Sequence, residues 1–142
     1  MLYFAYGSNL NHNEMKLRCP SAKFLGVAEL QGYELEFRYY LSVKENPNSS
    51  LLVGVWDIID DSEWDYLDYY EGYPILYTKQ TVKAVLEPNR NVEGIIYIMG
   101  EDKGTYKHNE RPSRKYYLRC ANGYKDCKIN LNQLSDALVK AI

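Results

Sequence analysis

The chain has 142 residues, with 17 basic and 19 acidic side chains and a net charge of −2. This balance offers no electrostatic footprint for nucleic acid or for an anionic membrane surface. The length suits one domain with its own core, and we expect a single domain over residues 1–142. No apolar run reaches the length of a membrane span, and no signal-peptide pattern opens the chain, so we expect neither an anchor nor a leader.

Cysteine and tyrosine are the informative residue types. The three cysteines are an odd number without ligand-like spacing, which argues against a disulfide framework and a zinc site and favours the reducing cytoplasm. The 15 tyrosines are unusual. Tyrosine packs as an aromatic ring and keeps a hydroxyl for hydrogen bonding, so it suits strands and the walls of polar pockets.

The first stretch reads as a strand, a tight polar turn and a helix. Met1–Tyr6 is an apolar, aromatic run typical of a buried strand, and Gly7–Asn9 interrupts it with turn residues. Asn11–Arg18 is predicted to be a short helix that its first residue caps, with Glu14 three positions later and Pro20 beyond its end. Such a turn can aim backbone N–H groups at an anion or a carbonyl oxygen, but it can equally be a plain connection.

The next stretch predicts long β structure. Lys23–Tyr40 alternates in part and indicates one or two strands, with a bend or bulge near Gly26 or Gly32. The polar segment Lys44–Ser50 is predicted to be a loop. Leu51–Ile59 is apolar and β-branched, and it is predicted to be a buried strand.

A second helix and a hairpin follow. Ser62–Glu71 is predicted to be a helix capped by its first residue, with Asp65 three positions later and Gly72 as the natural terminating residue. Ile75–Leu86 and Val92–Met99 are predicted to be strands paired as a hairpin.

The last third is polar and then helical. Gly100–Arg111 is long enough to suggest a movable flap. Pro112 suits the first position of a helix running to about Asn122, and Asn130 is predicted to cap a final helix. The apolar side of that final helix could cover the core or support a homodimer.

These elements predict the fold class. The strands are mostly consecutive and joined by short connections, which favours an α+β fold over a doubly wound parallel sheet. We expect a small mixed or antiparallel barrel-like sheet of about five to six strands with about four flanking helices.

One carboxylate does not fit its position. Trp64, Leu67 and Glu71 share one helical face, which must be the face toward the core. Glu71 also lies at the helix C-terminus, where the helix dipole disfavours an anion. Burial and the dipole both raise a carboxyl pKa, which is how a glutamate becomes a general acid–base near neutral pH. Alternatively, Glu71 reaches past the helix end into water or pairs with a basic residue.

Other candidate residues are weaker. Ser8 has no G-x-S-x-G elbow, and no His–Asp arrangement accompanies it, so a serine nucleophile is disfavoured. His12 and His108 lie in polar segments and are interpreted as surface residues. Four basic residues around the helix after Pro112 could form a solvated face or help to hold an acidic substrate. They are Arg111, Arg114, Lys115 and Arg119.

Several motifs, in chain order, make the sequence resemble the gamma-glutamylcyclotransferase family. The three main ones are Tyr3–Leu10 (YFAYGSNL), Leu67–Gly72 (LDYYEG) and Pro112–Tyr117 (PSRKYY). Leu17–Ala22 and Val53–Trp56 agree as well, so the likeness spans nearly the whole chain.

The resemblance implies a barrel-centred fold with a cavity at one side and a lyase or acyltransferase reaction of glutathione metabolism. A γ-glutamyl α-amine would attack its own γ-carbonyl carbon, releasing 5-oxoproline and a free amino acid or amine. The resemblance implies a small-molecule γ-glutamyl substrate and no metal or organic cofactor. It makes Glu71 the acid–base residue. Substrate-binding roles fall by position on Tyr6, Gly7, Ser8, Asn9, Leu10, Tyr77 and Tyr116.

Two alternatives stay open beside this interpretation. The enzyme could act only on γ-glutamylated amines, or the chain could be a non-catalytic module that keeps the fold and binds a small metabolite. A carboxylate with a raised pKa argues against the second, because it adds nothing to the binding of an anionic γ-glutamyl group.

Overall fold

The computed structural model describes residues 1–101 and 106–142 of the chain. Within these ranges the chain forms five strands, four α-helices and one 3-10 turn. The strands are β1 (Leu2–Ala5), β2 (Lys23–Arg38), β3 (Tyr40–Asp57), β4 (Tyr77–Leu86) and β5 (Arg90–Met99). The helical elements are η1 (Ser8–Leu10), α1 (His12–Arg18), α2 (Glu63–Glu71), α3 (Arg114–Asp126) and α4 (Asn132–Ala141).

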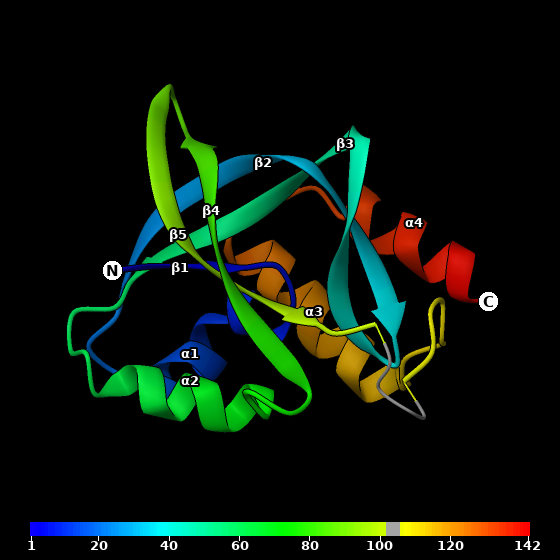
Figure 1. Cartoon of the computed structure of the whole chain (residues 1–142), viewed down its shortest axis with the longest axis horizontal. Coiled ribbons are helices and arrows are strands. Elements are labelled where there is room, and N and C mark those ends of the chain that lie inside the picture. The colour runs from blue at the N-terminus through cyan, green and yellow to red at the C-terminus, as the bar shows by residue number, and fades with distance from the viewer. Residues whose placement is uncertain (102–105) are drawn as a thin grey trace.

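The five strands close into a mixed barrel in the order β1-β3-β2-β4-β5 (Figure 1). β1 pairs antiparallel with β3 and parallel with β5, and the remaining pairs are antiparallel. Helices α1 and α2 lie side by side below the barrel in Figure 1, and α4 lies beside the long β2–β3 hairpin. The predicted α+β barrel with four helices is therefore confirmed.

The predicted loop Lys44–Ser50 is wrong, because these residues lie within β3. Glu45 pairs with Tyr33 and Ser50 pairs with Gln31, so the residues between them bulge out opposite Gly32. Pairing of Lys44, Glu45 and Ser50 with β2 outweighs the polar composition, which did not predict a strand here. The predicted irregularities near Gly26 and Gly32 are confirmed as register shifts in β2.

Some of the predicted helix boundaries are confirmed. The Asn11 side chain accepts a hydrogen bond from the backbone N–H of Glu14 at 3.2 Å, which caps α1. Gly72 ends α2 with a φ of 65°, a left-handed conformation that glycine adopts without a steric penalty. Gly72 therefore makes Glu71 the last residue of α2.

Other predicted boundaries are wrong. Ser62 does not cap α2, because its hydroxyl donates to the Asp60 carboxylate at 2.7 Å and its own backbone is already helical. Pro112 is not the first residue of α3. Ser113 caps that helix instead, accepting from the N–H of Tyr116 at 3.2 Å. The helix also continues to Asp126, four residues beyond the predicted end.

The turn after β1 is held by very close packing. A Cβ added to Gly123 in α3 would lie 2.6 Å from the backbone nitrogen of Asn11 and 2.8 Å from the Leu10 carbonyl carbon. On the strand side, the Leu10 side chain packs over Gly54 of β3. The turn Ser8–Leu10 therefore lies between α3 and the barrel. It contacts both at glycines, Gly123 and Gly54, where a larger side chain would clash.

Hydrogen bonds complete this support. The buried Tyr124 hydroxyl of α3 donates to the Tyr6 carbonyl at 2.9 Å. Gln133 of α4 donates to the Tyr124 hydroxyl at 2.9 Å, and its side-chain amide bonds both backbone groups of Leu52 in β3. Both C-terminal helices thereby hold the end of β1 against the barrel.

No helix in residues 1–101 or 106–142 has the length and apolar character needed to cross a membrane.

The contact at Gly123 gives the first prediction. Gly123→Ala should lower the free energy of unfolding by about 1–3 kcal/mol, because the new methyl group meets backbone atoms that cannot yield easily. Helix propensity alone would predict the opposite sign, a gain of about 1 kcal/mol. Urea denaturation measures the difference.

Asn122→Ala is the matched control, since Asn122 is an exposed neighbour in the same helix. It should be neutral or slightly stabilising. A Gly123→Ala protein as stable as the Asn122→Ala protein would contradict the close packing.

Candidate active site

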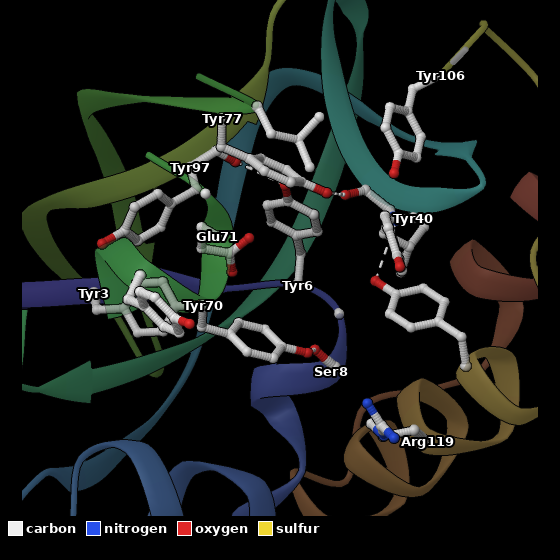
Figure 2. A pocket seen from close by; sticks show the side chains of 16 residues that line it. Tyr3, Tyr6, Ser8, Tyr40, Tyr70, Glu71, Tyr77, Tyr97, Tyr106 and Arg119 are labelled. Atoms are coloured by element: carbon white, nitrogen blue, oxygen red, sulfur yellow. Dashed lines mark hydrogen bonds between the residues drawn. The ribbon is translucent and has the colours of Figure 1, made fainter. Parts of the chain in front are cut away.

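A cavity of about 390 Å³ opens where the end of β1, the end of α2, the start of β4 and helix α3 meet (Figure 2). Nine of its 16 lining residues are tyrosines. Many of the chain's tyrosines therefore gather around this one cavity, although they come from segments that are far apart in the sequence.

Glu71 points into this cavity. Figure 2 shows its carboxylate among the rings of Tyr3, Tyr6, Tyr70 and Tyr97. Within residues 1–101 and 106–142, the carboxylate has neither a hydrogen-bond donor nor an ion-pair partner. Burial raises the pKa of Glu71 to about 8, and the Arg18 guanidinium opposes this rise. A carboxyl group in this state exchanges a proton readily near neutral pH.

Hydrogen bonds to the backbone fix the tyrosines at the inner wall. The Tyr6 hydroxyl donates to the Tyr97 carbonyl at 2.7 Å, and the Tyr77 hydroxyl donates to the Leu41 carbonyl at 2.6 Å. The Tyr116 hydroxyl accepts from the Leu41 N–H at 3.1 Å. These contacts hold the rings in single orientations, so the wall is preorganised.

Burial, together with the nearby charge of Glu71, raises the pKa of Tyr6, Tyr77 and Tyr116 well above its usual value. These hydroxyls stay protonated at physiological pH and cannot serve as bases.

Tyr97 is held from its far end. Its hydroxyl donates to the Asp68 carboxylate at 2.6 Å, and the Lys79 ammonium lies 3.0 Å from the same group. Asp68 lies one turn before Glu71 on α2. The hydrogen bond therefore holds the Tyr97 ring, which belongs to β5, against the helix that carries Glu71.

The turn after β1 contributes its first part to the cavity. Gly7 and Ser8 line it together with Tyr6, and the Ser8 hydroxyl shares a 2.7 Å hydrogen bond with the Tyr70 hydroxyl. The Arg18 guanidinium stacks on the Tyr70 ring, 3.4 Å from its centroid. A cation–π contact with Arg18 therefore stabilises the position of the Tyr70 ring in the cavity wall.

The second part of the same turn faces the framework. The Asn9 side chain donates to the Tyr3 hydroxyl at 2.9 Å and accepts from Arg18 at 3.0 Å. The Leu10 side chain is in the core, and its N–H donates to the Gly7 carbonyl at 3.0 Å. Of the predicted site residues, the structure brings Glu71, Tyr6, Gly7, Ser8, Tyr77 and Tyr116 to the cavity, whereas the side chains of Asn9 and Leu10 do not line it.

Ten further lining residues were not predicted as members of the site. Those with a tyrosine ring or a charge include Tyr3, Tyr40, Tyr97, Tyr106 and, among the basic residues, Arg119 specifically. The tyrosine count suited strands and the walls of a polar pocket, but it could not identify which rings form the pocket. Arg119 was one of four basic candidates, and the other three are exposed.

His12 is not the surface residue that the sequence suggested. Its ring packs between the rings of Phe24 and Trp56, with centroids 4.9 and 5.0 Å away. His108 is 44% exposed and bridges the Glu36 and Glu101 carboxylates. Neither histidine lines the cavity.

The connection predicted as a flap is described only in part, because residues 102–105 lie outside the described residues. The segments on both sides of them are anchored by Arg38, a buried residue of β2. Its guanidinium donates to the carbonyls of Gly100 and Tyr106, each at 2.7 Å.

No group of three or more His, Cys, Asp or Glu residues is arranged to hold a metal within the described part of the chain. The three cysteines are buried free thiols, and burial raises the pKa of each to about 12. They are therefore unreactive at neutral pH.

The family described as "Gamma-glutamyl cyclotransferase, AIG2-like" matches residues 3–119. A Homo sapiens Gamma-glutamylcyclotransferase is 29% identical over 138 residues, which cover 88% of this chain and 70% of that protein. A Mus musculus protein of the same name is 58% identical over 117 residues, covering 82% of this chain and 58% of that protein.

A solved structure named Gamma-glutamyl cyclotransferase has a TM-score of 0.80 to this chain at 26% identity, covering 96% of this chain and 85% of that one. The family match covers most of the chain, and the structural similarity agrees with that match. The chain belongs to the AIG2-like gamma-glutamyl cyclotransferase family.

The burial of Glu71 predicts a pH-dependent stability. Its carboxyl binds a proton more tightly in the folded protein, at a pKa of about 8, than in the unfolded chain, at 4.5. Because the folded state then binds more protons, the free energy of unfolding falls as the pH rises between these two values. Glutamine does not ionise, so Glu71→Gln removes this fall in the free energy of unfolding. The variant should be as stable as the wild type near pH 4 and more stable by about 1–3 kcal/mol near pH 9.

Urea denaturation at both pH values measures this difference. Asp65→Asn, an exposed carboxylate on the same helix, is the control and should show no such trend. A constant difference between Glu71→Gln and the wild type across the pH range would show that Glu71 titrates normally.

Proposed function

We propose that this protein is a γ-glutamyl cyclotransferase that uses Glu71 as its general acid–base. The substrate's α-amine attacks its own γ-carbonyl carbon, forming the ring C–N bond. The C–N bond to the leaving group then breaks, releasing 5-oxoproline and a free amino acid or amine. The observation that carries the proposal is the Glu71 carboxylate inside the tyrosine cavity, which has no partner among the described residues and a pKa raised to about 8 by burial.

Proton transfer is the step that needs this carboxylate. The attacking amine is mainly an ammonium group at neutral pH, and it must lose a proton before it can act as a nucleophile. The leaving nitrogen must gain a proton as its bond breaks. One carboxyl group can accept the first proton and return it to the leaving nitrogen, and a pKa near the working pH suits both transfers.

Preorganised walls support ring closure. The reaction is intramolecular, so an enzyme gains mainly by holding the substrate folded with its amine near the carbonyl carbon. The cavity, at about 390 Å³, lies within the range of small-molecule sites, and its tyrosines are anchored to the backbone. Such a cavity favours one folded conformer over the extended ones.

The turn after β1 supplies the electrostatic part of the proposal. Attack on the carbonyl develops negative charge on its oxygen, which backbone N–H groups can stabilise. The first N–H groups of a helical turn have no acceptor within the turn, and here the turn starts at the cavity wall, at Ser8. Leu10 is not available for this role, because its N–H donates to Gly7.

A 5-oxoproline release assay tests the reaction and the role of Glu71 together. The panel contains γ-glutamyl dipeptides and γ-glutamyl amines. The wild type should release 5-oxoproline, and Glu71→Gln should lower the rate by about 10²–10⁴-fold because an amide cannot accept the proton. Asp65→Asn on the outer face of α2 should leave the rate unchanged.

Each failure has its own meaning. Full release by a folded Glu71→Gln protein would keep the reaction and remove Glu71 from it. No release by the folded wild type from any member of the panel would favour a binding module over an enzyme.

A further inference from the structure

Arg119 is the second charged side chain of the cavity. Among the described residues that line the cavity, Glu71 and Arg119 are the only ones with a carboxylate or a basic group. Glu71 comes from α2 and Arg119 from α3, and Figure 2 shows them on different sides of Ser8. The charge that opposes the rise in the Glu71 pKa comes from Arg18, which agrees with Arg119 lying farther from that carboxylate.

Within residues 1–101 and 106–142, the Arg119 guanidinium has few contacts. Its Nε lies 3.7 Å from the Glu14 carboxylate, which is beyond hydrogen-bond distance. Glu14 has a shorter contact, 3.0 Å, with Arg18. A guanidinium carries five N–H donors in a planar fork, and no described residue accepts from the terminal donors of Arg119, which suit a carboxylate.

Arg18 differs in this respect. It donates to both Asn9 and Glu14 and stacks on Tyr70. Its guanidinium is therefore committed to the framework behind the cavity wall, and it does not line the cavity. Arg119 lines the cavity with 34% of its side chain exposed, and this solvent-accessible edge is called the opening here.

The opening also has aromatic neighbours. Tyr40 contacts Tyr116 and Tyr106, with ring centroids 5.2 and 5.8 Å apart. Burial raises the pKa of Tyr40, and Arg119 is close enough to oppose that rise. A group held at this opening would therefore meet a guanidinium beside a hydroxyl, both of which can donate to an anion.

The chemistry of the proposed substrates identifies that group. The α-carboxylate of the glutamyl part shares a carbon atom with the attacking amine, so it stays near Glu71. For Arg119 to contact the substrate, the leaving part must extend from the scissile nitrogen toward the opening. If the leaving part is an amino acid it carries a carboxylate, and if it is an amine it carries none.

We propose that Arg119 binds the carboxylate of the leaving amino acid and makes this protein selective for γ-glutamyl amino acids over γ-glutamyl amines of the same shape. This inference rests on the proposed function. It answers the question of leaving group that the sequence left open.

Two substrates that differ only in this carboxylate test the inference. They are γ-glutamyl-alanine and γ-glutamyl-ethylamine. The wild type should prefer the first in kcat/KM. Arg119→Met should lower kcat/KM for γ-glutamyl-alanine by about 10–100-fold, mainly through KM, as expected for losing a charge-assisted hydrogen bond. It should change the value for γ-glutamyl-ethylamine by no more than about 3-fold.

Two variants serve as controls. Arg119→Lys keeps the charge and should restore part of the preference, although it loses the planar fork. Arg114→Met removes an exposed charge from the same helix and should leave both substrates unaffected. Circular dichroism confirms that each variant is folded, and the wild-type preference is measured without any substitution.

Three results would overturn the inference. Equal turnover of both substrates by the wild type would show that the carboxylate is not recognised. An equal loss for both substrates in Arg119→Met would assign Arg119 to the glutamyl part, and no loss for either would make it a solvated residue. Absence of 5-oxoproline from both substrates with the wild type is a distinct result, because it overturns the proposed function and this inference with it.

Discussion

The close contact between α3 and the turn after β1 is the constraint on which the site depends. Gly123 leaves no room for a side chain between the helix and the backbone of Leu10 and Asn11, and Tyr124 bonds the Tyr6 carbonyl from the next position. These contacts end β1 at the cavity and turn the chain there. The same helix carries Tyr116 and Arg119, so one packing contact sets both walls of the opening.

A second feature is the environment of the Glu71 carboxylate. Burial among tyrosine rings destabilises its ionised form, while the Arg18 cation stabilises it, and burial is the stronger effect. The protein tolerates this unfavourable position because Gly72 ends the helix there and buried Leu67, one turn earlier, holds the helix face against the core. If Glu71 transfers protons as proposed, this local loss of stability is a common exchange between stability and activity.

Local patterns predicted the Asn11 cap, the Gly72 terminus, the β2 bulges and the inward direction of Glu71, because each depends on residues close in sequence. The strand through Lys44–Ser50 was missed, since its partner lies in β2 and outweighs its polar composition. Ser113 caps α3 although Pro112 was predicted to start it, and the Ser62 hydroxyl bonds Asp60 instead of capping α2, because the local turns set which side chain reaches the helix end. In the site, resemblance and helical spacing gave Glu71, but the assembly of Tyr3, Tyr97 and Arg119 depends on barrel closure, which no short pattern contains.

A direct titration of Glu71 tests the central claim that the cavity turns this carboxyl group into an acid–base near neutral pH. The ¹³C chemical shift of the glutamate side-chain carboxyl carbons, followed from acid to mild alkali, would be compared between the wild type and Glu71→Gln. The signal lost in the variant belongs to Glu71. It should titrate with a pKa of about 8. A midpoint near 4.5, the ordinary value for glutamate, would contradict the account, because the residue would then be a solvated carboxylate.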